Sequence, residues 1–126
     1  MSAHHRMFAA AGLALLTAFG SVPAWAHAKL LSSVPAANGI LSAAPAEIIL
    51  TFNEAVTLIS FKIVDQDGKE HPAGGPARRD GATVHLPIAG PLMDGSYTVN
   101  YRAAGNDGHA MNATLAFSVR SAKPER

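Results

Sequence analysis

Two histidines in this sequence have neighbours that could make them metal ligands. His27 directly follows Ala24-Trp25-Ala26, a small-x-small pattern that is typical of the site where signal peptidase cuts. A cut after Ala26 would make His27 the first residue, and its α-amine and imidazole Nδ1 could then chelate one metal ion together. Such a pair of nitrogens suits Cu(II), which favours tetragonal sites of nitrogen and oxygen ligands.

His109 lies in the second suggestive segment, Gly105-Asn106-Asp107-Gly108-His109, which joins two apparently antiparallel strands. Asp107 and His109 are two residues apart, so in an extended backbone their side chains project to the same side. With His27 they offer three nitrogens and one carboxylate oxygen, a set that suits Cu(II) and is poor for Ca²⁺ or Mg²⁺. In the other interpretation Asn-Asp-Gly is simply a turn signal, and Asp107 caps that turn.

The other two histidines of residues 27–126 are expected elsewhere. His71 follows two charged residues in a polar loop, and we expect it on the surface. His85 stands between Val84 and Leu86 in a strand, so its side chain projects to the face opposite theirs and should meet solvent.

The N-terminal segment predicts export. Residues 4–6 are His-His-Arg, and residues 7–19 form an apolar run broken only by Gly12 and Thr17. This run is shorter than the roughly 20 residues that span a bilayer, so residues 1–26 are interpreted as a cleaved secretory signal peptide. Two alternatives stay open: a retained membrane anchor, and a cut after Ala24 that would leave Trp25 first and abolish the chelate.

Residues 27–126 suit one small domain with a single core. The chain has ten Lys and Arg against nine Asp and Glu, and Arg6 belongs to the leader, so the remaining charges balance. The basic residues are scattered, with only Arg78 and Arg79 adjacent, which argues against a nucleic-acid-binding stripe. The chain has no cysteine, which excludes thiolate metal sites and cysteine nucleophiles.

Short apolar segments alternate with turns rich in Pro, Gly, Asn and Asp. Their β-branched and aromatic residues recur with a period of two, which predicts strands at residues 29–34, 47–52, 60–64, 83–86, 97–102 and 113–119, with a further short one at 56–59. Strands at this spacing predict an all-β fold, either a β-sandwich or a Greek-key β-barrel. Residues 121–126 are expected to form a flexible polar tail.

Several segments resemble the CopC family of secreted copper-binding proteins. The resemblance covers essentially all of residues 27–120. It is most specific at the two ends, His27 to Ala36 and Asp107-Gly108-His109, and it also includes residues 52–56, 65–69, 95–99 and 115–119.

The resemblance implies a Greek-key β-barrel or sandwich of about seven strands, with an Ig-like or cupredoxin-like look. It implies a periplasmic protein that sequesters or delivers copper, holding one Cu(II) per chain through His27, Asp107 and His109. Glu54 takes the position of a family acidic residue near the copper, where it is a ligand or supports the ligands from outside; a solvent-exposed carboxylate at a strand end is the alternative. A copper transporter of the CopD type in the inner membrane is the implied partner, and the protein is expected to be a monomer that binds no nucleic acid.

Some members of that family also have a methionine-rich Cu(I) site. After the leader this chain has only Met93 and Met111, so no such site is expected. The resemblance implies a protein that binds copper without being an enzyme. The alternatives are a copper-dependent oxidative enzyme of the lytic monooxygenase type, whose site also uses an N-terminal histidine, and a metal-free Ig-like binding domain.

Overall fold

The computed structural model describes residues 28–121. The predicted signal peptide, the predicted ligand His27 and all but the first residue of the predicted tail lie outside these residues. The described part contains no helix, and therefore none that could cross a membrane. Its strands are β1 (Leu30–Val34), β2 (Gly39–Leu41), β3 (Glu47–Phe52), β4 (Thr57–Asp65), β5 (Glu70–His71), β6 (Arg78–Asp80), β7 (Thr83–Pro87), β8 (Gly95–Ala104) and β9 (Ala110–Val119).

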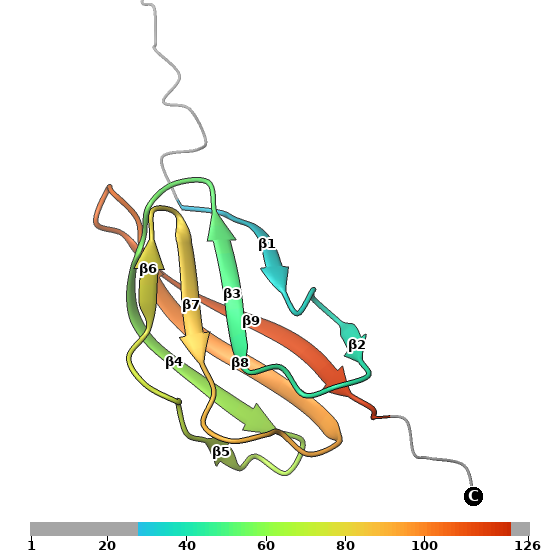
Figure 1. The fold of residues 1–126 in the computed structure, drawn as a ribbon. Helices are drawn as coiled ribbons and strands as arrows, with labels where there is room; N and C mark the ends of the chain where they lie inside the picture. Colours follow the sequence, from blue (N-terminus) through green and yellow to red (C-terminus); the bar gives the residue numbers. More distant parts are fainter. Residues whose placement is uncertain (1–27, 122–126) are drawn as a thin grey trace, which may run out of the picture.

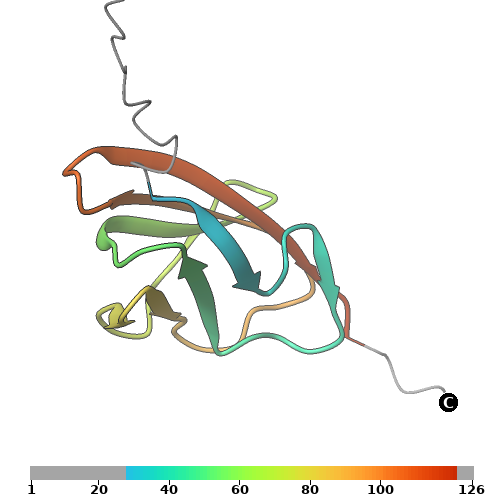
Figure 2. The same ribbon diagram turned by 90° about the horizontal axis from the view of Figure 1, so that it is seen from above.

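The strands form two sheets that pack face to face (Figures 1 and 2). One sheet has the order β1-β3-β7-β6 and the other the order β2-β9-β8-β4-β5. All neighbouring strands are antiparallel except β2 and β9, which run parallel. The predicted all-β architecture is confirmed as a two-sheet sandwich, and the sheets do not close into a single barrel.

The six main predicted strands are all present, and most extend beyond the predicted bounds. The sequence pattern missed β2, β5 and β6, which are only two or three residues long. An alternation with a period of two cannot be recognised over so few residues, because at least about four residues are needed to show it.

Strand β4 unites two segments that the sequence pattern separates. Its pairing with β8 shifts between Leu58, opposite Ala103, and Ser60, opposite Arg102, so Ile59 is an extra residue in a β-bulge. The extra residue reverses the alternation: Leu58 is partly buried, while Ser60 and Lys62 are exposed. The apparent break in the pattern is therefore a bulge inside one continuous strand.

The core lies between the two sheets and follows the alternation of the strands. Phe52 of β3 meets Tyr101 of β8 edge to face, with ring centroids 6.2 Å apart, and Tyr97 stacks on Phe117 of β9 at 5.5 Å. The fully or nearly fully buried aliphatic side chains around them include Ile48, Leu50, Ile63, Val84, Leu86, Val99, Leu115 and Val119. The loops at the two ends of the sandwich begin where this contiguous core ends.

His71 is paired with a carboxylate at the end of β4. The expected loop is wrong, because His71 lies in β5; its side chain is partly exposed, at 24%. Its Nε2 lies 2.9 Å from Asp65 Oδ2, and its ring packs edge-on against Tyr97. The hydrogen bond with His71 holds the pKa of Asp65 below its ordinary value of 3.8, against the opposing effect of burial; the backbone N–H groups of Lys69 and Asp67 also lower it.

Acid should destabilise the protein in part through Asp65. A carboxyl group with a lower pKa in the folded than in the unfolded chain stabilises the fold above pH 3.8, and this contribution is lost as the pH falls through the lower folded value. We expect the unfolding temperature of Asp65→Asn to change less between about pH 5 and about pH 2.5 than that of the parent protein. Asp67→Asn is the control, because the Asp67 carboxylate accepts no hydrogen bond from the residues that the structure describes. Equal pH dependence of Asp65→Asn and the parent would contradict this assignment.

Three segments meet at the opposite end of the sandwich from β5. They are the start of the described chain, the connection from β3 to β4, and the connection from β8 to β9, all at the top of Figure 1 and at the left of Figure 2. The last two carry Glu54 and the pair Asp107 and His109. This end of the fold therefore carries three of the residues predicted for the metal site.

Candidate metal centre

The start of the described chain is fixed to the β3–β4 connection by two hydrogen bonds. The Lys29 N–H donates to Asn53 Oδ1 at 2.7 Å, and the Asn53 N–H donates to the Lys29 carbonyl at 2.9 Å. Ala28, one residue earlier, is buried. The backbone immediately after His27 is thus held in place by the fold.

Glu54 ties this region to the β8–β9 connection. Its Oε1 accepts a hydrogen bond from the Asn106 N–H at 3.2 Å, across 52 positions of sequence. Gly105 provides the space for this contact, because a Cβ placed there would lie 2.5 Å from Glu54 Oε1 and 3.1 Å from the Ala28 Cβ. Glu54 is half-buried, so it is not the solvent-exposed carboxylate of the alternative interpretation.

Asp107 and His109 face each other across a tight turn. Asp107 Oδ1 accepts the His109 N–H at 3.0 Å, and Asp107 Oδ2 lies 3.0 Å from His109 Nδ1. Gly108 between them has φ of +80°, a left-handed conformation that glycine adopts without strain. The two side chains therefore come together through a turn and not, as the spacing predicted, through extended backbone. The turn-capping interpretation of Asp107 also holds, and it is compatible with metal binding.

The exposure of this pair suits a binding loop. The His109 side chain is 74% exposed, whereas that of Asp107 is 23% exposed. The Asp107 carboxylate holds the imidazole in one orientation through Nδ1, so an oxygen and a ring nitrogen already face each other in the loop. The loop can thus present His109 in a fixed orientation.

The structure brings Glu54, Asp107 and His109 onto two loops at one end, while His27 lies outside the described residues. Within residues 28–121 no three His, Asp or Glu side chains stand close enough to hold a metal by themselves. His85 is partly exposed on the outer face of its sheet, as predicted, and its Nδ1 lies 3.3 Å from Glu47 Oε1. Neither His85 nor His71 belongs to the loops at this end.

Sequence reasoning missed the parts played by Asn53, Gly105 and Asn106. Gly105 and Asn106 were visible only as turn residues, since the contact that requires a glycine comes from a distant segment of the chain. The short distance from a Cβ at Gly105 to Glu54 and Ala28 is a tertiary property with no local signal.

Gly105→Ala should destabilise the protein by about 1–3 kcal/mol, since the new methyl group forces Glu54 or Ala28 to move. Chemical denaturation of the variant measures this loss. In Gly105→Ala combined with Glu54→Ala the carboxylate is absent, so the alanine at 105 should cost less than it does alone. Strictly additive losses in this double-mutant cycle would show that the two residues do not compete for space.

Comparison with known proteins identifies the family. Residues 30–120 match the family model described as the CopC domain. Protein YobA of Escherichia coli strain K12 is 37% identical over 113 residues, covering 86% of this chain and 91% of its own. Copper resistance protein C of Pseudomonas syringae pv. tomato is 37% identical over 109 residues, covering 79% of this chain and 86% of its own.

Solved structures share the fold. PcoC, a methionine-rich copper resistance protein from Escherichia coli, matches with a TM-score of 0.65 at 29% identity, over 75% of this chain and 100% of its own. CopC from Methylosinus trichosporium OB3b matches with a TM-score of 0.66 at 27% identity, over 79% of this chain and 100% of its own. The alternative of an oxidative enzyme is set aside, because CopC family proteins are copper-binding resistance proteins and not enzymes. With a family model that spans most of the sequence and relatives of this identity, the chain belongs to the CopC family of copper-binding resistance proteins.

Proposed function

We propose that this chain is a periplasmic Cu(II)-binding protein that sequesters copper or delivers it to a membrane transporter. One Cu(II) is held by the α-amine and Nδ1 of His27 together with Asp107 and His109. The observation that supports this most is the packing of Ala28 against Gly105, because it places the residue after His27 beside the loop that carries the other two ligands.

Covalent geometry limits how far His27 can lie from that loop. Consecutive Cα atoms across a trans peptide are about 3.8 Å apart. The Ala28 nitrogen, which is bonded to His27, lies 3.3 Å from the position of a Cβ on Gly105. If the leader is cut after Ala26, the new α-amine therefore arises one residue from the anchored Ala28, within reach of residues 105–109.

The donor set explains the preference for Cu(II). Two nitrogens from one residue form a chelate, and the Asp107–His109 turn is already ordered by its own hydrogen bonds, so binding requires little further ordering. Asp107 Oδ2 and His109 Nδ1, which lie 3.0 Å apart, are close enough to be ligands of one ion. Glu54, bonded to Asn106, adds a second negative charge beside the cation and supports the loop from outside the ligand set.

Cu(I) should not be a second cargo. Soft thioether ligands favour Cu(I), and PcoC is described as methionine-rich. Met111 pairs with Ala103 near the loop end of the β8–β9 hairpin, whereas Met93 precedes Gly95 at its other end. Two methionines at opposite ends of ten-residue strands cannot share one copper ion.

Export and a membrane partner complete the proposed function. Residues 1–26 serve as the signal peptide, residues 27–120 as the copper-binding domain, and the polar end from 121 as a tail; Ser121 is itself hydrogen-bonded to Asp94. The protein acts as a monomer, and a CopD-type transporter of the inner membrane is the proposed recipient of its copper.

The intact mass of the exported protein, followed by a Cu(II) competition titration, tests this function. We expect a chain that begins at His27 and that saturates at one Cu(II), with affinity falling as the pH is lowered because each ligand must lose its proton to bind. A chain that begins at Trp25 or at Met1, or a titration without a stoichiometric end point, would contradict the proposal.

A further inference from the structure

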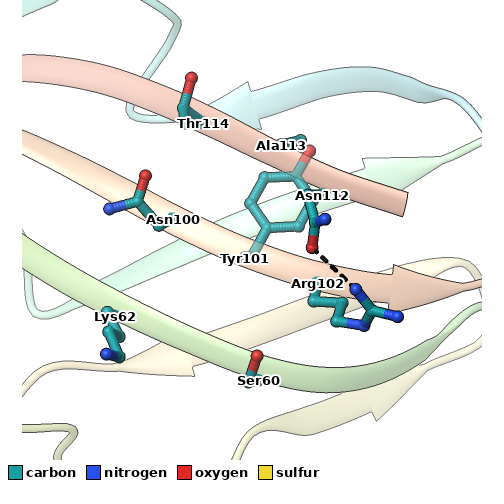
Figure 3. A pocket seen from close by; sticks show the side chains of 8 residues that line it. All are labelled: Ser60, Lys62, Asn100, Tyr101, Arg102, Asn112, Ala113 and Thr114. Atoms are coloured by element: carbon teal, nitrogen blue, oxygen red, sulfur yellow. Dashed lines mark hydrogen bonds between the residues drawn. The ribbon is translucent and has the colours of Figure 1, made fainter. Parts of the chain in front are cut away.

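A groove on the outer face of the five-stranded sheet takes no part in the proposed copper site. It has a volume of about 460 Å³ and crosses β4, β8 and β9 (Figure 3). Its exposed lining consists of Ser60, Lys62, Asn100, Arg102, Asn112 and Thr114. The opposite face of these strands is the buried core, so the groove is a separate surface.

The strand register arranges the six side chains in two rows. Ser60, Arg102 and Asn112 lie opposite one another across the three strands, and Lys62, Asn100 and Thr114 form the second row, two residues further along each strand. The bulge at Ile59 brings β4 into this arrangement, because it turns Ser60 and Lys62 outward after Leu58 has faced the core. A bulge also bends and twists its strand, which favours a hollowed sheet face.

The exposed side chains that line the groove include cations but no carboxylate. All six side chains can donate hydrogen bonds, and none carries a negative charge. Among the described residues no carboxylate lies within ion-pair distance of Lys62 or Arg102. Arg102 Nη1 donates to Asn112 Oδ1 at 3.3 Å, a neutral acceptor that orients the guanidinium across the groove and leaves its charge uncompensated (Figure 3).

We propose that this groove binds an extended, carboxylate-rich segment of a partner protein. The domain as a whole is net neutral, but the groove is lined by two cations and four neutral donors and by no acid. Such a surface is complementary to acidic oxygens. The two rows are two residues apart along the strands, about 7 Å, and alternate residues of an extended peptide repeat at the same distance. Carboxylates at every second residue can therefore reach Lys62 in one row and Arg102 in the other.

The open face disfavours a single small anion. The lining side chains are exposed, so each ion pair is weakened by water and salt, and affinity has to come from several contacts made together. A segment with several carboxylates supplies these contacts along one continuous chain. A small anion can engage only one cation with a few neighbouring donors.

Titration of the ¹⁵N-labelled protein with the peptide Ala-Glu-Ala-Glu-Ala-Glu-Ala, followed by NMR, tests the proposal. Shifts should concentrate on β4, β8 and β9, and they should diminish as salt is raised. Lys62→Gln combined with Arg102→Gln should weaken binding at least about tenfold. Lys69→Gln, which removes an exposed cation outside the groove, should leave the affinity within about twofold. Thermal unfolding confirms that the variants are folded.

Four outcomes would overturn the proposal. The first is equal binding of a peptide in which Gln replaces every Glu, and the second is unchanged affinity of the double variant. The third is that citrate or inorganic phosphate reproduces both the shifts and the affinity, which would identify a small-anion site. The last is binding to vesicles of half phosphatidylglycerol that the double variant loses while the peptide produces no shifts, which would identify a membrane-facing surface.

Discussion

His27→Ala is expected to weaken Cu(II) binding by at least about a hundredfold, or about 2.7 kcal/mol. The substitution keeps the α-amine but removes the imidazole, so it breaks the chelate. In the chelate, once one nitrogen of His27 has bound the copper, the second nitrogen of the same residue binds with little further loss of conformational entropy. A competition titration of the exported variant measures the change.

His71→Ala and His85→Ala are the matched controls for this loss. Both histidines are paired with carboxylates away from the loops at the metal end, Asp65 and Glu47 respectively. Neither change should alter Cu(II) affinity beyond error. If His85→Ala lost copper while His27→Ala kept it, the proposed centre would be in the wrong part of the molecule.

His109→Ala should produce the second largest loss, about tenfold to a hundredfold in Cu(II) affinity, because it removes one nitrogen and leaves the His27 chelate in place. Asp107→Asn should cost less than either histidine and still be measurable. It keeps the shape of the turn, in which Oδ1 accepts the His109 N–H, but removes the charge that offsets the cation.

Circular dichroism separates these effects from unfolding. Asp107 and His109 belong to an exposed loop outside the buried core, so Asp107→Asn and His109→Ala should both remain folded. The stability change of His109→Ala should be within about 0.5 kcal/mol. An Asp107→Asn variant that bound copper more weakly than His109→Ala would reverse the proposed ranking and make the carboxylate the principal ligand of the loop.

The fold could be predicted largely from the sequence because its longer strands alternate cleanly. In β3 the residues Ile48, Leu50 and Phe52 are buried and their neighbours are half-buried, which is the period-two pattern in its plainest form. In β4 the bulge at Ile59 reverses that pattern midway, so the sequence pattern predicts two strands where the structure has one. The parallel pairing of β2 with β9 depends on residues far apart in sequence and leaves no local trace.

The candidate site was predictable only in part, for the same physical reason. Asp107 and His109 carry a local signal, since their types and spacing are typical of a ligand pair in a turn. The contact of Glu54 with Asn106, and the space that Gly105 provides for it, arise from the packing of two loops distant in sequence. His71 shows the converse case, in which a histidine that looked like a surface residue is held by Asp65 and Tyr97.

Electron paramagnetic resonance of the exported protein loaded with one equivalent of Cu(II) tests the central claim most directly. The proposed centre has three nitrogen ligands, the α-amine and two imidazoles, and one carboxylate oxygen. The account predicts a tetragonal spectrum at neutral pH with couplings to three nitrogens, one of them lost in His109→Ala. A spectrum indistinguishable from that of aqueous Cu(II), or one unchanged by both His27→Ala and His109→Ala, would contradict it.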